Sequence, residues 1–331
     1  MPIAQINPEA MINKPLPMVD VLRDGGFEVK YPTNALLARG VCTEDELIEE
    51  LAGISAVVAT AETYTGKVIA ALPDLRVIAR AGVGYDGVDV AAATKHNVAL
   101  TITPTANHAA VAELALALLF ATTKRMVDGH KKVVSGQWPR TPLTPIRGKT
   151  LGIFGLGRIG RSMAVRSQAL GMKVIATEQF PDESFLRENG IVLVDFESLL
   201  KQSDFITIHS PLTDETRGLF NRDAFSKMKQ GSILINSARG PIVVEADLLD
   251  ALNSGHLAAA GLDVFETEPP SKDNPLFQLD NVVVSPHIAG ADVLSLEQMG
   301  TEAAQCIAKL YRGEWPDGAV VNDTLKGSWS W

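Results

Sequence analysis

The chain has 331 residues, a length that suggests about two domains, each large enough to bury a core. Hydrophobic residues make up 46% of it and charged residues 21%, as in ordinary globular proteins. The formal net charge of −9 argues against binding to nucleic acid through a basic surface. The longest apolar run, residues 109–125, is interrupted by Glu113 and ends in charge, so no membrane span is predicted.

The N-terminal residues show neither the basic nor the apolar region of a secretory signal. Cys42 and Cys306 lie far apart and match no metal-binding or redox spacing. We therefore expect a cytoplasmic protein with no metal site and no membrane partner.

Short apolar segments alternate with helical ones from near the start of the chain. Continuous runs of Val, Ile and Ala are typical of strands buried on both faces, and their alternation with helices indicates parallel sheets built of βαβ units. In the first third, the pattern predicts strands at 27–32, 56–60, 76–80 and 97–103, and helices at 43–51 and 65–72.

A long helix from about Asn107 to Met126 follows, and then a loop at 135–149 that contains Gly and Pro, a natural crossing between domains. The same alternation restarts there, with the six strands expected of a complete dinucleotide-binding fold. These strands are predicted at 150–155, 172–177, 204–209, 232–237, 258–264 and 281–287.

A last helix, from about Asp292 to Tyr311, is long enough to return to the first domain. We therefore predict a discontinuous first domain, residues 1–103 and 292–331, and a second domain of residues 104–291. The pattern suggests no role for Trp329 and Trp331 in the short tail.

Gly155, Gly157 and Gly160 form a GxGxxG turn between a predicted strand and an amphipathic helix that ends at Gly171. In this context the helix N-terminus directs its N–H groups at a pyrophosphate. Glu178 closes the next strand, where a carboxylate would accept the ribose hydroxyls of NAD and repel the 2′-phosphate of NADP. We predict a site that prefers NAD; the alternative is a tight turn followed by an incidental acid.

Arg239, Glu268 and His287 each follow one of three successive predicted strands, at the edge where open α/β sheets bind ligands. Any one of them alone could be an ordinary loop residue. Together they suit hydride transfer between a 2-keto acid and a 2-hydroxy acid. Histidine can exchange the proton, a carboxylate can orient the imidazole, and arginine can clamp the substrate carboxylate. The cofactor would supply the hydride.

Five other histidines compete for this role. His209 closes a strand at the same edge and is expected in the cofactor pocket. The remaining four lie on or beside predicted helices, where surface or packing roles are expected: His96, His108, His130 and His256.

Taken together, these motifs resemble the D-isomer-specific 2-hydroxyacid dehydrogenases. After the glycine turn come HSPLT at 209–213, INSARG at 235–240, LDVF at 262–265 and PHIAG at 286–290. The resemblance implies that Arg239, Glu268 and His287 are the catalytic residues, and that Glu266 is out of register with the catalytic acid. It also implies that Asp263 contacts the nicotinamide amide. The cofactor-binding set that it implies is Gly155, Gly157, Arg158, Ile159, Gly160, Glu178, His209, Pro211, Ser237, Ala238, Asp263 and Gly290.

The first domain resembles the family as well. RAGVGYDGVD at 80–89 is similar to the family's substrate loop, in which Gly82, Val83 and Gly84 would hold a carboxylate together with Arg239. The segment 103–113 resembles the crossing between domains. The resemblance implies a Rossmann cofactor domain inserted into a flavodoxin-like substrate domain, with the active site between them and water excluded on closure. It also implies a homodimer joined through the cofactor domain and its crossing helix.

Within the family, the chain looks most like the phosphoglycerate and hydroxypyruvate branch, without its regulatory domain. Phosphoglycerate users carry a basic residue near the end of the strand matched by 56–60, where this chain has Ala59 and Thr60 followed by Glu62. Arg80 remains nearby. We expect a smaller or differently charged 2-hydroxy acid as substrate.

Two alternative functions stay open at this point. One is an NAD-sensing binding protein of the kind represented by the C-terminal-binding-protein corepressors. The other is phosphite oxidation, which retains the Arg, Glu and His. Formate enzymes place Gln at the position of Glu268, so that residue favours keto-acid chemistry.

Overall fold

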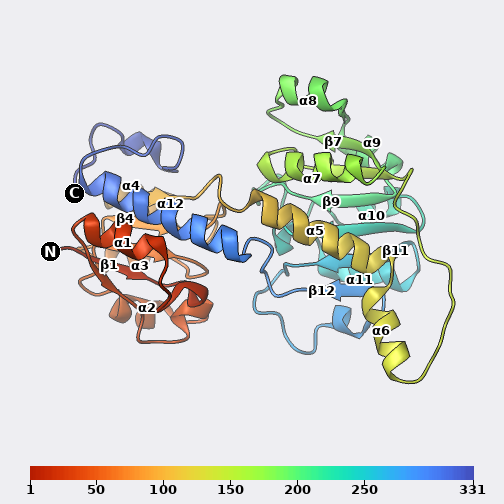
Figure 1. Cartoon of the computed structure of the whole chain (residues 1–331), viewed down its shortest axis with the longest axis horizontal. Coiled ribbons are helices and arrows are strands. Elements are labelled where there is room, and N and C mark those ends of the chain that lie inside the picture. The colour runs from red at the N-terminus through yellow and green to blue at the C-terminus, as the bar shows by residue number, and fades with distance from the viewer. The chain divides into compact units, whose positions relative to one another are not determined.

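The computed structural model describes the backbone of residues 1–331 and every side chain except that of Ala38. The chain divides into two compact units (Figure 1). Unit 1 comprises Met1–Asn107 and Gly290–Trp331, and unit 2 comprises His108–Ala289. The boundary expected after residue 103 falls inside unit 1, because the amide of Thr103 donates to the Gly82 carbonyl and Ala106 is buried in the unit 1 core.

Unit 1 is built on a five-stranded parallel sheet in the order β2-β1-β3-β4-β5. This is the flavodoxin-like order, in which the direction of winding reverses between β1 and β3. The strands are β1 (Ile3–Ile6), β2 (Glu28–Lys30), β3 (Ala56–Ala59), β4 (Val77–Arg80) and β5 (Ala99–Thr101). The helices are α1 (Pro17–Asp24), α2 (Glu44–Glu50), α3 (Gly66–Ala70), α4 (Val90–Lys95) and α12 (Val293–Tyr311).

Alternate residues of the unit 1 strands face two separate cores, as the two-residue period of a strand requires. Ala56 and Val58 pack with α1 and α12 on one face, and Val57 and Ala59 pack with α2, α3 and α4 on the other. Because both faces are covered, β3 is apolar throughout and β4 is apolar up to its last residue, Arg80, which is why these two strands could be recognised in the sequence.

Strand β1 was not predicted. It is only four residues long and carries the polar Gln5, so it lacks the apolar run of its neighbours. It nevertheless pairs with both β2 and β3 near the centre of the sheet. Tertiary pairing thus overrides a weak local signal.

Unit 2 is built on a seven-stranded parallel sheet in the order β12-β11-β10-β9-β6-β7-β8. The strands are β6 (Thr150–Phe154), β7 (Lys173–Thr177), β8 (Val192–Leu193), β9 (Phe205–Ile208), β10 (Ser232–Asn236), β11 (Leu257–Leu262) and β12 (Val282–Val284). Six of them were predicted, and the seventh, β8, is a two-residue edge strand. Winding reverses at β6, so the glycine turn that follows β6 lies at the switch point where such folds bind dinucleotides. The α/β class with two parallel-sheet domains is therefore confirmed.

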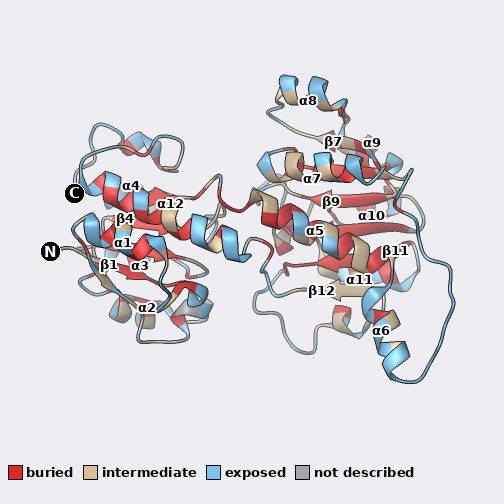
Figure 2. Ribbon diagram, viewed as in Figure 1, coloured by how far each residue is buried: buried red, intermediate tan, exposed pale blue. Residues whose placement is uncertain are grey.

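Helices cover both faces of the unit 2 sheet, whose central strands are buried (Figure 2). Helices α5 (His108–Thr123) and α7 (Arg158–Ala169) pack on one face. Helices α9 (Phe196–Gln202), α10 (Arg222–Lys227) and α11 (Glu245–Asn253) pack on the other. The remaining elements are α8 (Glu183–Asn189) and α6 (Met126–Val134).

The helix predicted from about Asn107 to Met126 is α5, and a second helix, α6, follows it. The break comes at Arg125, whose φ of 48° is left-handed and cannot continue a helix. The sequence predicted no element over residues 126–134, and the loop predicted at 135–149 follows α6.

The C-terminal tail docks on unit 1, which gives its tryptophans a structural role. The indole N–H of Trp329 donates to the Asn97 carbonyl at 3.0 Å, and Arg76 Nε donates to the Trp331 carbonyl at 3.2 Å. The Trp331 ring lies edge-on to Tyr311, with centroids 4.9 Å apart. These aromatic contacts bury apolar area that the short tail could not bury alone.

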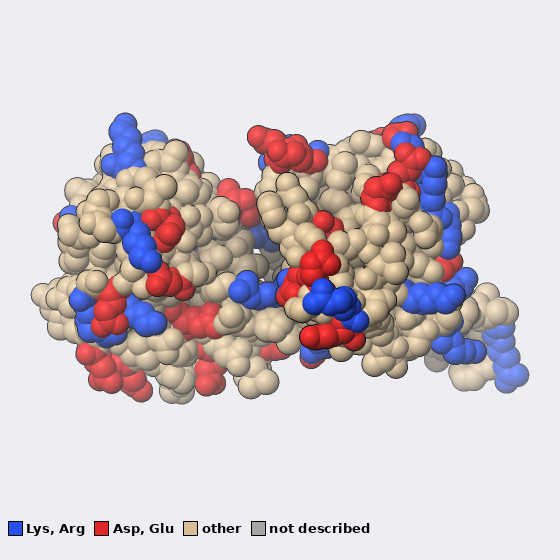
Figure 3. All heavy atoms as spheres, turned by 90° about the horizontal axis from the view of Figure 1, so that it is seen from above, with Lys and Arg blue, Asp and Glu red and all other residues tan. Residues whose placement is uncertain are grey.

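In the part of the chain that the structure describes, no helix is long and apolar enough to span a bilayer. Among those same residues, no three His, Cys, Asp or Glu side chains are grouped so as to hold a metal ion. On the face seen in Figure 3, acidic and basic side chains are interspersed.

Candidate active site

The glycines of the turn after β6 have two different physical roles. Gly155 has φ +95°, and a Cβ there would lie 2.7 Å from the Ser210 nitrogen. A Cβ at Gly160 would collide with the Gly155 carbonyl, so close packing requires both of these glycines. A Cβ at Gly157 would meet nothing within 4 Å, although Gly157 caps the N-terminus of α7. The space at Gly157 therefore suits close approach of a phosphate to the N–H groups of α7.

Glu178 lies directly beside this turn. Its Oε2 accepts from the Leu156 amide at 2.7 Å, and its Oε1 accepts from the amides of Gln179 and Phe180 at 2.9 and 3.0 Å. A carboxylate offers about four acceptor positions, so it can still take a hydroxyl donor. These contacts fix the acidic group next to the glycines, where the sequence predicted it.

Other expected cofactor residues follow β9 and β10, the first and second strands along the sheet from β6. His209 follows β9, with its Nε2 2.9 Å from Thr207 Oγ1, and Ser237 follows β10. Burial lowers the pKa of His209 to about 3, so the imidazole is neutral. Gly290, in contrast, falls in unit 1, where it packs closely against Asn107.

Arg239 is carried by a turn that Asn236 holds at the end of β10. Asn236 Oδ1 accepts from the Ala238 amide at 3.0 Å, and its Nδ2 donates to the Arg239 carbonyl at 2.9 Å. The Arg239 guanidinium donates to the Ala238 carbonyl at 2.6 Å. The following Gly240 is required because a Cβ would collide with the Phe265 carbonyl. This is the physical reason for the Arg-Gly pair.

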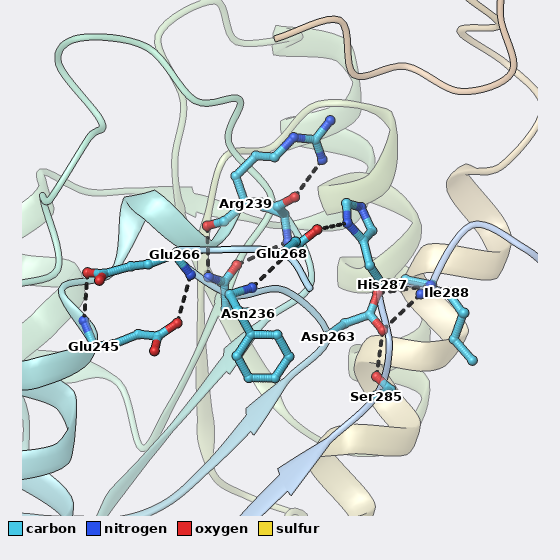
Figure 4. Close-up of polar contacts among 12 residues, drawn as sticks. Asn236, Arg239, Glu245, Asp263, Glu266, Glu268, Ser285, His287 and Ile288 are labelled. Carbon is cyan, nitrogen blue, oxygen red and sulfur yellow. Dashed lines mark hydrogen bonds and ion pairs between the residues drawn. The ribbon is translucent and has the colours of Figure 1, made fainter. Parts of the chain in front are cut away.

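His287 and Glu268 are joined by a hydrogen bond (Figure 4). Nδ1 of His287 lies 2.6 Å from Oε2 of Glu268, and Oε1 of the same carboxylate accepts from the Phe265 amide at 2.9 Å. An ionised carboxylate at Nδ1 keeps the proton on that nitrogen. Nε2 is then the ring nitrogen that can exchange a proton with a substrate.

The charges around Glu268 keep it ionised. Burial disfavours the carboxylate, but the hydrogen bond and charge of His287, the Phe265 amide and the charge of Arg239 outweigh that cost and lower the pKa of Glu268. Arg239, Glu268 and His287 are thus within electrostatic reach of one another at one edge of the unit 2 sheet.

Asp263 holds the loop that carries His287. The Asp263 side chain is fully buried. Its Oδ1 accepts from Ser285 Oγ at 2.5 Å and from the Ile288 amide at 3.1 Å. Its Oδ2 accepts from the Ala289 amide at 2.9 Å, and its carbonyl accepts from the His287 amide. These bonds stabilise the positive φ of 52° at His287, which a non-glycine residue rarely adopts. The nicotinamide contact expected of Asp263 stays a prediction.

Glu266 is separated from the His287 pair. It accepts from the Glu245 amide at 3.0 Å, and Glu245 in turn accepts from the Glu266 amide at 2.7 Å (Figure 4). Glu266 is therefore engaged at the start of α11, and Glu268 is the carboxylate that meets His287.

The predicted substrate loop lies in unit 1, after β4. Gly82 has φ +151°, a conformation that favours glycine, and the Gly84 carbonyl accepts from Arg80 Nε at 3.1 Å. The loop ends where the backbone of Tyr64 pairs with Gly87 and Asp89.

Two supporting residues were missed in the sequence, Asn236 and Ser285. Both are short polar residues that close the apolar run of a strand. Asn236 bonds to the turn that carries Arg239, and Ser285 bonds to the Asp263 carboxylate that holds the loop of His287. A polar residue that closes an apolar run is the signal that could have revealed them.

Comparison with known proteins gives one consistent result. The D-isomer specific 2-hydroxyacid dehydrogenase, NAD binding domain, matches residues 116–289. The chain is 41% identical over 298 residues to a D-3-phosphoglycerate dehydrogenase of Archaeoglobus fulgidus, covering 89% of this chain and 55% of that protein. It is 39% identical over 266 residues to a glyoxylate reductase of Korarchaeum cryptofilum, covering 78% and 80%. This chain spans about half the length of the phosphoglycerate dehydrogenases that it matches.

The fold comparison agrees. The crystal structure of TT0316 protein from Thermus thermophilus superposes with a TM-score of 0.84 at 33% identity, covering 96% of this chain and 99% of that one. The family domain match includes the glycine turn, Arg239, Glu268 and His287. The chain belongs to the D-isomer-specific 2-hydroxyacid dehydrogenase family.

Proposed function

We propose that this protein is an NAD-dependent dehydrogenase that interconverts a small D-2-hydroxy acid and its 2-keto acid. The observation that carries the proposal is the His287–Glu268 pair, 2.6 Å apart and within the field of Arg239. Glu268 follows β11 and His287 follows β12. Both strands belong to the sheet in which β6 leads into the glycine turn, and that turn leaves space for a dinucleotide.

In the reduction, His287 donates the proton at Nε2 to the carbonyl oxygen of the keto acid, while Glu268 stabilises the charged imidazole. Arg239 binds the substrate carboxylate with paired hydrogen bonds and polarises the carbonyl. NADH, when held at the glycine turn of Gly155, Gly157 and Gly160, would supply the hydride for this reaction. The keto acid gains one hydride and one proton, and His287 takes the proton back in the reverse direction.

The same proposal includes NAD as the preferred cofactor. Gly155, Gly157 and Gly160 would hold the pyrophosphate at α7, with Arg158 and Ile159 in its first turn. Glu178, fixed beside that turn, would accept ribose hydroxyls and repel a 2′-phosphate. His209 is neutral, so it offers no positive charge to the 2′-phosphate that distinguishes NADP from NAD.

We propose a substrate smaller than 3-phosphoglycerate or without its dianionic phosphate. The end of β3 has Ala59 where a cation would be needed, and Glu62 follows it. One relative is named for 3-phosphoglycerate, which is larger and carries a phosphate, and another for glyoxylate, which is smaller. The relatives' names are therefore compatible with a substrate of either size. We further propose a cytoplasmic homodimer, since Cys42 and Cys306 form no disulfide and α6 exposes apolar side chains.

A substrate screen tests the proposal. Glyoxylate, hydroxypyruvate, pyruvate and longer 2-keto acids would be assayed with NADH and with NADPH by absorbance, and 3-phosphoglycerate and phosphite with NAD. We expect NADH-dependent reduction of at least one keto acid at a kcat/KM above that for 3-phosphoglycerate. Phosphite oxidation without keto-acid reduction would contradict the proposal, and so would tight NADH binding with no turnover of any of these compounds.

A further inference from the structure

A buried asparagine closes strand β10 directly before the turn that carries Arg239. Asn236 is only 1% exposed. Its backbone is in register with Ile208 of β9 on one side and with Leu262 of β11 on the other. A residue held between two neighbouring strands has little freedom to move, so the Asn236 side chain is a rigid support at the edge of the sheet where the candidate site lies.

The side chain of Asn236 uses its acceptor and its donor on two different peptide groups of the turn (Figure 4). Oδ1 accepts from the Ala238 amide at 3.0 Å, and Nδ2 donates to the Arg239 carbonyl at 2.9 Å. The Arg239 guanidinium donates to the Ala238 carbonyl at 2.6 Å, and that carbonyl belongs to the peptide group between these two. Asn236 therefore fixes the backbone on both sides of the point at which the guanidinium is attached.

Asparagine suits this position better than other short polar residues. Its side chain carries both an N–H donor and a separate acceptor oxygen, and it places them close to the backbone. Aspartate would set a second oxygen against the Arg239 carbonyl. A serine hydroxyl can accept from the amide two residues further on, but it has one oxygen to serve both peptide groups. A buried carbonyl that loses its donor costs free energy, so an apolar residue here would release the turn.

The same turn is tied to the segment after β11, which carries the carboxylate partner of His287. The Asp263 amide donates to the Asn236 carbonyl at 2.9 Å, and the Asp263 side chain holds the loop of His287. A Cβ at Gly240 would collide with the Phe265 carbonyl, and the Phe265 amide donates to the carboxylate that meets His287, at 2.9 Å. The turn of Arg239 thus contacts the backbone that supports both members of the hydrogen-bonded pair.

We propose that Asn236 is a positioning residue that acts through Arg239: its side chain sets the turn so that the guanidinium is presented at a fixed place relative to His287. The inference rests on the proposed function, in which Arg239 binds the substrate carboxylate while His287 exchanges the proton. A substrate that meets both groups needs them at matched positions, and a displacement of about 1 Å can cost about 100-fold in rate. Asn236 is not a catalytic residue, because its side chain is buried and bonds to the backbone of the turn.

The test compares two substitutions at one position. Asn236→Leu has a similar volume and no hydrogen-bonding group, and Asn236→Ser keeps one hydroxyl for the Ala238 amide. Asn322→Leu is the matched control, because Asn322 is a buried asparagine of unit 1 that makes the same two kinds of bond. Its Oδ1 accepts from the Leu100 amide, and its Nδ2 donates to the Val98 carbonyl.

The measurements separate positioning from a loss of stability alone. Amide hydrogen exchange of the peptide that spans 236–242 reports the order of the turn without any substrate. Steady-state kinetics with glyoxylate and with hydroxypyruvate give kcat and KM, and fluorescence gives the Kd of NADH. Thermal unfolding gives the melting temperature of each variant. The double variant Asn236→Leu/Arg239→Lys shows whether Asn236 acts through the guanidinium.

We expect Asn236→Leu to speed exchange in the turn and to lower kcat/KM by about 100-fold. The loss should be shared between a higher KM and a lower kcat, because Arg239 both binds the carboxylate and polarises the carbonyl. Asn236→Ser should lie between Asn236→Leu and wild type, and the Kd of NADH should stay within about twofold in both. The double variant should match Arg239→Lys alone within about twofold. Asn322→Leu should lower the melting temperature with turn exchange and kcat/KM unchanged.

Exchange in the turn of Asn236→Leu equal to that of wild type would overturn the inference, whatever reaction the protein performs. A loosened turn with unchanged kcat/KM would also overturn it, and so would a double variant in which the two losses add. If Asn236→Leu does not fold, wild-type exchange and kinetics in Asn236→Ser overturn the inference just as directly. If the turn loosens while the wild-type protein reduces no 2-keto acid, the proposed function is refuted and the hold of Asn236 on the Arg239 turn stands.

Discussion

His287 is held by two acidic residues that act on different parts of it. The carboxylate of Glu268 accepts at the ring, with Nδ1 and Oε2 2.6 Å apart, and the main-chain carbonyl of Asp263 accepts from the His287 amide at 2.8 Å. Glu268 sets the orientation of the ring, and Asp263 sets the position of the backbone from which the ring projects. A proton donor aimed in this way is the arrangement that keto-acid reduction requires.

Replacing His287 with alanine should remove the proton donor and leave the glycine turn intact. We expect kcat/KM for the keto acid to fall by roughly 10²–10⁴, the range usual for a general acid, with the Kd of NADH nearly unchanged. Stopped-flow or steady-state absorbance measures the first, and fluorescence titration the second. His96→Ala, an exposed histidine of unit 1, is the control and should behave as wild type. Loss of NADH binding with turnover preserved would contradict the assignment.

Replacing Glu268 with glutamine should change the pH profile as well as the rate. The pKa of Glu268 is lowered, so the carboxylate is ionised above that value and its support for a charged His287 is lost only as pH falls through it. Glu268→Gln lacks this carboxylate, so the decline in reduction rate that follows protonation of Glu268 at low pH should be absent from the variant, whose rate should be lower than that of wild type at every higher pH.

Glu266→Gln provides the matched control for that experiment. Glu266 has the same side chain as Glu268 and lies two residues before it in the sequence. Its carboxylate bonds to the Glu245 amide rather than to His287. Its pH profile should match wild type. A shift in the Glu266 variant with none in the Glu268 variant would show that the wrong carboxylate had been chosen.

Much of the fold could be predicted because buried parallel strands leave a plain sequence signal. Runs such as residues 233–235 are apolar throughout, since helices cover both faces of the sheet. The misses have local causes. Strand β1 is short and contains Gln5, β8 has two residues, and the break before α6 depends on the backbone of Arg125. In each case, packing or a single dihedral angle decides the outcome.

The candidate site was predictable where residue type and strand end coincide, as at Arg239 and His287. What could not be predicted is which polar groups meet. The bond from Asp263 to Ser285 joins residues 22 positions apart, and the bonds of Asn236 depend on the local shape of the 237–239 turn.

The choice of cofactor should depend on Glu178. Wild type should use NADH with a kcat/KM at least about 100-fold above that for NADPH. Glu178→Ala should reduce this ratio, mainly by weakening the binding of NADH. Glu183→Ala, an exposed acid in the first turn of α8, is the control and should keep the ratio. Because Glu178 also bonds to the Leu156 amide, thermal unfolding of the variant shows whether the turn has survived. A ratio unaffected by Glu178→Ala would assign the preference to other residues.

Truncating Trp329 to alanine should destabilise unit 1. The half-buried indole bonds to the Asn97 carbonyl and lies in the aromatic cluster with Trp315 and Trp331. We expect a loss of about 1–3 kcal/mol in the free energy of unfolding, at the lower end of values for large aromatic residues because the site is only partly buried. Denaturant unfolding measures it. Phe180→Ala, whose ring is 79% exposed, should change little. Equal effects of the two substitutions would show that the tail is not anchored as described.

Association should depend on the exposed apolar surface of α6 and the loop that follows it. Val134 and Trp138 are each 74% exposed, and Met126, Val133 and Leu143 are each more than half exposed (Figure 2). Isolated apolar residues are common on surfaces, but five within 18 positions of the sequence are typical of an interface. Light scattering should therefore give twice the chain mass for wild type and for Leu36→Glu, a matched exposed position in unit 1. Trp138→Glu combined with Val134→Lys should shift the protein towards the monomer, because the charges introduced on each copy would be buried in the dimer interface. A wild-type protein that stays monomeric at micromolar concentration would refute the dimer, and a double variant that stays dimeric would place its interface elsewhere.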